Sequence, residues 1–337
     1  MSRDPDGDPV EFRISLNYFA IPLGIAGLAG AWTTASAALG APDWVSDLLF
    51  SISGVCWLVF SVLYVGERLR SRGAFRADRE HPTDGAQAAF IPVVGLLLLT
   101  HFERYIPRGA AQAVCWILVC ALAVVAGQLF AYWLTGQTSF PQLHPGYFLP
   151  LVAGPFVASI SLSTVGVHTA ARAALGAGMF FWVIIGGVVT ARLITAGPLP
   201  VLAIPALSVL LAPPATGGIA AFIAYRSQNG TLQTTFLGIF MTMLMVQFFL
   251  MPQYRRLGFG LQFWTFTFPV AASANYGMRW CQSAQFLGWK GLSWAALTIA
   301  TAVVLAIAVA TVRSLVPVKR HRTPRPATEL EPEQKTD

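Results

Sequence analysis

Residues 200–225 read PVLAIPALSVLLAPPATGGIAAFIAY. This stretch holds no charged side chain, and Pro205, Pro213 and Pro214 lie in its interior. A helix needs roughly 20 apolar residues to cross the hydrocarbon core of a bilayer. Because an interior proline removes a backbone hydrogen bond and crowds the preceding turn, the stretch predicts a bent transmembrane helix.

The rest of the chain has the same apolar character. Of its 337 residues, 55% are hydrophobic and 11% are charged, whereas a soluble domain carries about 25% charged residues. The polar first 13 residues lack the pattern of a cleavable signal peptide, so the first apolar run is expected to be a span. We predict ten spans, at about residues 15–38, 43–66, 86–102, 109–135, 147–167, 170–195, 200–225, 232–251, 259–280 and 288–315.

Proline alternates among these ten spans. The odd-numbered spans contain interior prolines and the even-numbered spans contain none. A carbonyl freed by proline is tolerated in a membrane where it is buried in protein or faces a watery cavity. The pattern therefore predicts an all-α integral membrane fold of five helical hairpins, with kinked odd helices inside around a central pore and even helices outside. The prolines are Pro22, Pro92, Pro150, Pro155, Pro205, Pro213, Pro214 and Pro269.

The distribution of Lys and Arg predicts the orientation of the chain. With ten spans, sixteen of the 22 basic residues fall on the side of the two termini and six on the other side. Basic residues are enriched on the cytoplasmic side, so we expect a multi-pass protein of the inner (plasma) membrane with both termini in the cytoplasm. We divide it into a short cytoplasmic N-terminus (1–13), a ten-helix channel domain (14–315) and a disordered tail, basic and then acidic (316–337).

Carboxylates are missing from most of the membrane region. No Asp or Glu occurs between Glu103 and Glu329, whereas the same stretch holds fourteen Lys or Arg residues. The acidic rings of many cation channels and the carboxylate clusters that hold Mg²⁺ therefore have no counterpart here. We expect a positive internal potential that attracts anions. The contributing residues are Arg104, Arg108, Arg172 and Arg279 outside, and Arg192, Arg255 and Arg256 inside.

Enzymatic and metal-dependent functions have little support in the sequence. The four cysteines form no CxxC pair. Ser159, Ser161 and Ser163 have no base nearby in the sequence that could activate them. We therefore expect no enzymatic activity, cofactor, metal or nucleic-acid partner. His101 is the candidate for a titrating group at depth in the membrane.

Five short motifs, in order along the odd spans, carry a family resemblance. They resemble the TehA tellurite-resistance and C4-dicarboxylate transporter family, which includes the slow anion channels of plant guard cells, over about residues 15–315. The resemblance implies five hairpins around a pseudo-fivefold axis, in agreement with the prolines, and a homotrimer with one pore per protomer. The motifs are YFAIPLG (18–24), His81-Pro82 followed by Phe90 and Pro92, PGYFLP (145–150), Ala212-Pro213 and FWTFTFP (263–269).

The last of these motifs identifies a candidate gate. In the family a phenylalanine of the ninth helix plugs the pore, and the motif places Phe268 at that position. A benzyl group across a narrow uncharged tube imposes a dehydration barrier on an anion. Two departures, Ala20 in place of a common glycine and the additional Pro214, are expected to reshape the pore. The expected pore-lining and kink residues are Phe19, Pro22, Gly24, Phe90, Pro92, Phe148, Pro150, Pro213 and Pro269.

Two functions fit these observations. The first is an anion channel or channel-like transporter for small anions such as halides, nitrate, oxyanions or C4-dicarboxylates, gated by Phe268. The alternative is a proton-coupled exporter of sulfite, tellurite or dicarboxylate, for which His101 would be the first group to test. In either case the expected partners are small anions and the lipid bilayer.

Overall fold

The computed structural model describes residues 15–70, 84–136, 138–225 and 230–315, and every regular element in these ranges is a helix. The N-terminus (1–13), the tail (316–337) and the His81-Pro82 motif lie outside the described residues. Nine described spans are long and apolar enough to cross a membrane. The remaining long segment, α11, is less apolar and is packed inside the protein. The predicted all-α membrane fold is confirmed.

The ten long segments alternate between an inner and an outer layer. The inner segments are η1 (Leu16–Phe19) with α1 (Ala20–Leu39), α4 (Asp84–Gln87) with α5 (Phe90–Phe102), η4 (Pro145–Tyr147) and η5 (Leu149–Ala153) with α7 (Gly154–Thr164), η6 (Val201–Leu211) with α9 (Ala212–Tyr225), and η7 (Leu261–Phe266) with α11 (Thr267–Ala284). The outer helices are α2 (Asp43–Arg70), α6 (Arg108–Leu134), α8 (His168–Thr195), α10 (Thr231–Tyr254) and α12 (Trp289–Leu315). Two short 3₁₀ turns, η2 (Glu103–Tyr105) and η3 (Phe140–Gln142), belong to the connections.

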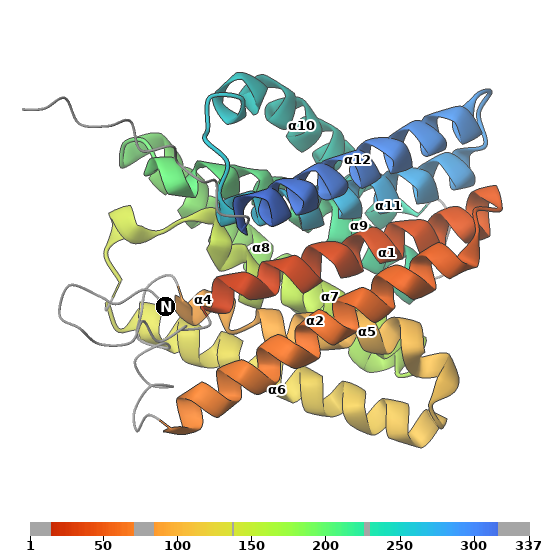
Figure 1. The fold of residues 1–337 in the computed structure, drawn as a ribbon, viewed down its shortest axis with the longest axis horizontal. Helices are drawn as coiled ribbons and strands as arrows, with labels where there is room; N and C mark the ends of the chain where they lie inside the picture. Colours follow the sequence, from red (N-terminus) through yellow and green to blue (C-terminus); the bar gives the residue numbers. More distant parts are fainter. Residues whose placement is uncertain (1–14, 71–83, 137, 226–229, 316–337) are drawn as a thin grey trace, which may run out of the picture.

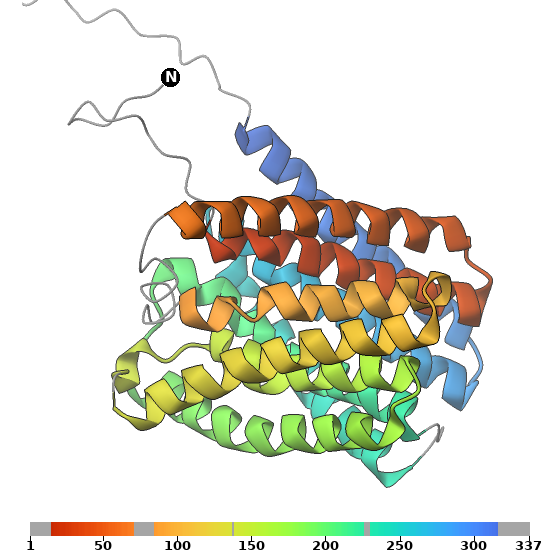
Figure 2. The ribbon, with the colours of Figure 1, turned by 90° about the horizontal axis from the view of Figure 1, so that it is seen from below.

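The inner helices form a closed ring. Helices α1, α5, α7, α9 and α11 each contact the next, and α11 contacts α1 again. Each outer helix packs against the inner helix that precedes it in the chain, so the unit is a hairpin (Figures 1 and 2). Between 56% and 89% of the residues are buried in the four inner spans outside α11, against 17% to 28% in the outer spans. The predicted order, odd helices inside and even helices outside, is confirmed.

Each inner α-helix carries a proline at its second or third residue. The amides of the first turn have no partner within an α-helix, so a proline there costs little. Outer helix α2 supplies donors to two of these bends: Ser53 Oγ donates to the carbonyl of Pro22 (2.8 Å) and Trp57 Nε1 to that of Ile91 (2.9 Å). Helix α2 thus stabilises the bend of α1 within its own hairpin and the bend of α5 in the neighbouring hairpin. The prolines are Pro22, Pro92, Pro155, Pro213 with Pro214, and Pro269.

One proline departs from the expected alternation. Helix α10 continues to Tyr254, so Pro252 lies in the last turn of an outer helix. The sequence-based boundary at residue 251 was wrong by about one turn. A proline this close to the end leaves most of the helix unaffected, so α10 remains part of the outer layer.

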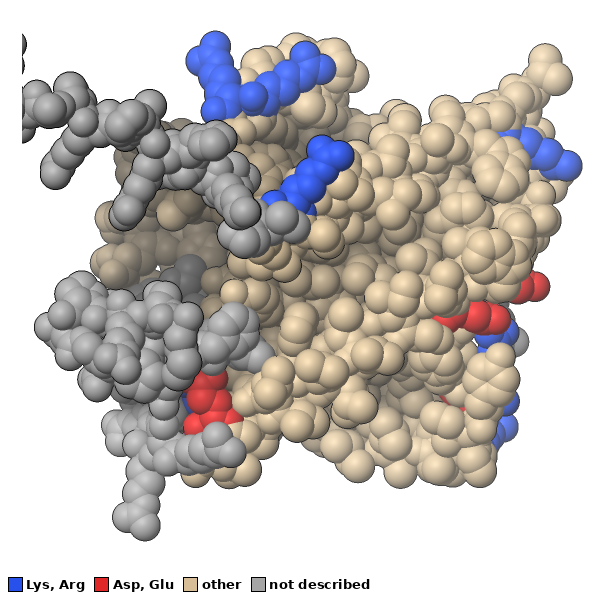
Figure 3. Space-filling model, in the orientation of Figure 1, with Lys and Arg blue, Asp and Glu red and all other residues tan. Residues whose placement is uncertain are grey.

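Charged side chains gather at the two ends of the molecule. On the face shown in Figure 3, the surface between the two ends consists of uncharged residues. Helix α1 begins, and α12 ends, at the same end of the bundle (Figure 1). This arrangement agrees with an even number of membrane crossings.

Candidate functional site: a central pathway interrupted by Phe268

Two cavities lie along the ring of inner helices. All five inner segments contribute to each cavity, so both lie between these segments rather than between a hairpin and the lipid. The Arg279 cavity, of about 250 Å³, is lined by Ala26, Gly27, Gly30, Thr33, Phe50, Leu97, Thr100, His101, Glu103, Arg104, Val157, Ile160, Thr216, Ile219, Ile223, Phe268, Ala272, Asn275 and Arg279. The His144 cavity, of about 580 Å³, is lined by Ser15, Asn17, Tyr18, Ala20, Leu23, Ala86, Gln87, Phe90, His144, Gly146, Leu149, Ala153, Pro200, Leu202, Ala203, Ala206, Val209, Ala212, Leu261, Gln262, Trp264, Thr265, Phe268 and Pro269.

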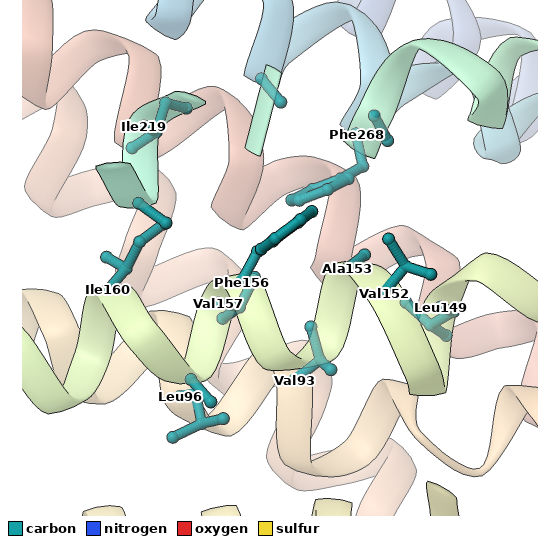
Figure 4. Close-up of a cluster of buried hydrophobic side chains, with 14 of the residues drawn as sticks. Val93, Leu96, Leu149, Val152, Ala153, Phe156, Val157, Ile160, Ile219 and Phe268 are labelled. Atoms are coloured by element: carbon teal, nitrogen blue, oxygen red, sulfur yellow. The ribbon is translucent and has the colours of Figure 1, made fainter. Parts of the chain in front are cut away.

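Phe268 belongs to the lining of both cavities. It is the second residue of α11 and is 8% exposed. In Figure 4 its side chain lies among apolar side chains that project from the neighbouring inner helices, including Val157 and Ile219. Gly27 of α1 packs against the Phe268 ring. A Cβ added at Gly27 would lie 2.9 Å from Cδ2 of the ring, so a larger side chain would clash there. The ring therefore forms part of the wall of both cavities.

The other aromatic residues expected to line the pore divide into two groups. Phe90 lines the His144 cavity. Phe19 is buried against Phe60 and Tyr64 of α2, with ring centroids 6.0 and 6.4 Å apart. Phe148 is buried toward α8, where a Cβ at Gly186 would lie 4.0 Å from its ring. Among the described residues, neither Phe19 nor Phe148 lines either cavity.

The residues expected at the kinks mostly pack within the wall of the ring. Pro269 lines the His144 cavity. The other five are buried and are not part of either lining as described: Pro22, Gly24, Pro92, Pro150 and Pro213. Gly24 lies where α1 crosses α11, and a Cβ there would lie 1.9 Å from Oγ1 and 2.6 Å from Cβ of Thr267. Its role in this structure is close packing between the two helices.

A polar network occupies the wall of the Arg279 cavity away from Phe268. Arg279 Nε donates to Asn275 Oδ1 (3.0 Å), and Arg279 Nη2 lies 3.1 Å from Thr34 Oγ1. The Thr34 hydroxyl donates to the same Asn275 oxygen (2.8 Å). Phe268, Asn275 and Arg279 are spaced so that they lie on one face of α11. The cavity thus changes from hydrocarbon at Phe268 to a cation at its other end.

A second cluster lies at the mouth of the same cavity. His101 Nε2 lies 2.9 Å from Asp47 Oδ1, and Arg104 Nη2 lies 2.6 Å from the same oxygen. The His101 ring stacks on Phe50, with centroids 4.2 Å apart. Asp47 is thereby occupied by two basic side chains. Glu103 also lines the cavity here and brings an acidic group to its mouth.

Arg192 differs in role from the other basic residues expected at the mouths. It is 3% exposed, and its guanidinium donates to the carbonyls of Pro141 (3.1 and 3.0 Å) and Gly197 (3.2 Å). This side chain joins the loop before α7 to the end of α8. Arg192 therefore acts as a structural cross-link between these two segments and not as an exposed charge at the mouth of the pathway.

The His144 cavity is neutral along its described lining, which contains no Asp, Glu, Lys or Arg. Burial and, to a lesser extent, the nearby charge of Arg192 lower the pKa of His144 to about 4, so the ring is uncharged at neutral pH. Nδ1 accepts a hydrogen bond from the Gly146 amide (3.1 Å), which places the proton on Nε2. Nε2 has no hydrogen-bond partner among the described residues. The cavity therefore offers an uncharged donor in its wall.

A family model described as a voltage-dependent anion channel, SLAC1, matches residues 13–312. The match covers all ten helices of the two layers. The chain belongs to the SLAC1 family. Five inner helices, each with a proline in its first turn, are thus the form that a SLAC1-family member takes in this protein.

Individual SLAC1-family relatives are more distant in sequence. The tellurite resistance protein TehA homolog of Haemophilus influenzae is 28% identical over 269 residues, which cover 78% of this chain and 80% of the relative. The S-type anion channels SLAH3 and SLAH2 of Arabidopsis thaliana are 23% and 22% identical and match 90% and 89% of this chain. The matches cover 49% and 59% of those two plant proteins.

Sequence reasoning missed three polar residues of this SLAC1-family pathway. Asn275 and Thr34 form the network with Arg279, and Thr216 lines the same cavity from α9. A signal for Asn275 was present, because it lies seven residues after Phe268 and therefore on the same helical face. Thr34 and Thr216 carried no such signal, since their positions depend on how α1 and α9 are rotated toward α11.

Proposed function

We propose that this protein conducts small anions along the axis of its inner ring and that the side chain of Phe268 closes the path. The observation that carries the proposal is that Phe268 lines both cavities. An anion that crosses between them has to pass the ring, where hydrocarbon replaces its water shell. A dehydration barrier of this kind closes a pore without any charged gate.

The charges along the path favour anions over cations. Arg279 lines one cavity, and the described lining of the other contains no carboxylate. From the excess of basic residues on the side of the termini, we place both termini in the cytoplasm of the inner membrane. In this orientation the Arg279 cavity opens to the outside. Halides, nitrate, oxyanions and C4-dicarboxylates all remain candidate substrates.

Selectivity is the direct test of this function. Planar bilayers that contain the Phe268→Ala protein are placed in a salt gradient, and the reversal potential is measured. We expect it to lie near the equilibrium potential of the anion. A reversal potential near that of the cation, in a protein that is correctly folded by size-exclusion chromatography, would contradict anion conduction.

We further propose that the protein assembles as a homotrimer with one path per protomer. The support is the family resemblance together with the enclosure of a complete ring within a single chain. The mass of one chain is 36.2 kDa. Light scattering of the purified protein in detergent, corrected for bound detergent, is expected to give three times this mass. A value of one or two chains would contradict this assembly.

The alternative function is anion export coupled to proton movement. The observation that favours it is the position of His101, a titratable residue, in the lining of the Arg279 cavity. We expect the protein to act as a channel without proton coupling, because the His101 side chain is held by Asp47 and stacked on Phe50. Anion uptake into liposomes should then follow the anion gradient and be insensitive to an imposed pH gradient. The His101→Gln protein should behave in the same way. Proton movement in fixed ratio to the anion, lost in His101→Gln, would establish the exporter instead.

A further inference from the structure

Arg279 carries a charge that neither the ring nor the gate explains. Its side chain is half-buried in the wall of the cavity, and no Asp or Glu in the described ranges comes within 4.0 Å of its guanidinium. Its described partners, Asn275 and Thr34, are neutral. A cation at this depth without a counter-charge is costly, and a bound anion would offset that cost.

Asn275 is oriented by the same network. Its Oδ1 accepts from both Arg279 Nε and the Thr34 hydroxyl, so the amide oxygen faces these two donors. The Nδ2 group therefore points the other way, toward Gly30, where an added Cβ would lie 3.4 Å from it. Both Asn275 and Gly30 line the cavity. The network thus fixes an N–H donor at the cavity wall between Arg279 and Phe268.

Thr216 belongs to the neighbouring inner helix, α9, which packs against α11. It lies near the start of α9 in the wall of the same cavity and is 2% exposed. Its hydroxyl has no hydrogen-bond partner among the described residues. Threonines in helices usually donate to the carbonyl four residues earlier, as Thr33 and Thr100 of this cavity do. The Thr216 oxygen is itself buried within the wall, so Thr216 borders the Phe268 end of the cavity without offering its hydroxyl to a ligand there.

We propose that Arg279 and Asn275 Nδ2 form a binding site for one small monovalent inorganic anion, such as a halide or nitrate, on the Arg279 side of Phe268. The single uncompensated cation matches one negative charge, and a second charge would remain unpaired against apolar walls such as Ile160, Ile219 and Ile223. Asn275 and Arg279 are four residues apart, which spans roughly 6 Å along α11, about one turn, so both side chains can contact one ion. The position of this site beside a gate rests on the proposed function, whereas binding itself does not.

Binding is tested without transport. The purified wild-type protein in detergent is titrated with sodium chloride, and exchange of bound chloride is followed by the NMR line width of chloride. We expect Arg279→Gln to weaken binding roughly tenfold or more. Lys290→Gln removes a charge of the same sign from an exposed position on α12 and is expected to leave binding unchanged. Chloride binding in Arg279→Gln equal to that of the wild type would overturn the site.

A second variant, Asn275→Asp, tests the site independently in case Arg279→Gln fails to fold. Asn275→Asp has nearly the same shape and places a carboxylate beside the Arg279 guanidinium, so it neutralises the cation and removes the Nδ2 donor. We expect a monodisperse protein without measurable chloride binding. Unchanged binding in Asn275→Asp would also overturn the site. If chloride binds as expected but Phe268→Ala conducts no current, the gate is wrong and the binding site stands.

Discussion

Replacing Phe268 by alanine is expected to raise the anion conductance of the protein at least about tenfold, which corresponds to lowering the barrier by about 1.4 kcal/mol. Phe268 lines both cavities, of about 250 and 580 Å³, and under the proposed function removal of its ring joins them into one continuous path. An anion then keeps more of its water while it passes the bend of α11. The measurement is single-channel current in planar bilayers under identical salt on both sides.

Two further variants separate gating from a general loosening of the core. Phe268→Leu keeps a branched hydrocarbon side chain at this position and should give an intermediate conductance. Phe148→Ala removes a ring of the same size from the inner layer, 1% exposed and outside both described linings, and should leave conductance at the wild-type level. Equal currents from Phe148→Ala and Phe268→Ala would argue for leakage through a damaged core rather than for a gate.

Gly24→Ala is expected to have the largest effect on stability. The added methyl group would meet both Oγ1 and Cβ of Thr267, so rotation of the threonine side chain cannot remove the clash. Thr267 is fully buried, and its hydroxyl donates to the carbonyl of Trp264 (2.6 Å). Helix α1 must therefore move away from α11, with a cost of about 1–3 kcal/mol. We expect a lower melting temperature and less monodisperse protein in detergent.

Gly277→Ala provides the matched control for this change. Gly277 lies in the interior of α11, and a Cβ there would meet nothing within 4 Å. Alanine is favoured over glycine in a helix by up to about 1 kcal/mol, so this variant should be as stable as the wild type or more stable. A melting temperature for Gly24→Ala that matches that of Gly277→Ala would show that the α1–α11 contact tolerates a side chain.

The layered fold could be predicted from the sequence because its signal is local and repeated. Pro22, Pro92 and Pro269 each mark the first turn of an inner helix, where the missing amide costs little. The same prolines would be expensive in the middle of a lipid-facing helix. Their absence from the interior of the even spans therefore distinguishes the outer layer. Only the last turn of α10, with Pro252, departs from this pattern.

The directions of individual side chains could not be predicted in the same way. Phe19 ends a 3₁₀ segment of four residues, and Phe148 immediately precedes a π-helical segment. A 3₁₀ helix turns about 20° more per residue than an α-helix, so four residues shift the exposed face by about 80°. Such a shift separates a side chain that faces the cavity from one that faces an outer helix. Phe268 lies just inside α11, and the family motif was needed to place it on the axis.

The moderate apolarity of α11 has a consequence for biogenesis. This helix carries Asn275 and Arg279, residues that partition poorly into hydrocarbon when a helix leaves the translocon alone. Helix α12 follows after a short connection and is among the most apolar spans, so the two are best integrated together as a hairpin. They follow the other four hairpins along the chain, and α11 has to dock between α1 and α9, the first and fourth inner helices. The circle of inner helices therefore stays open between α1 and α9 until this fifth hairpin is in the membrane.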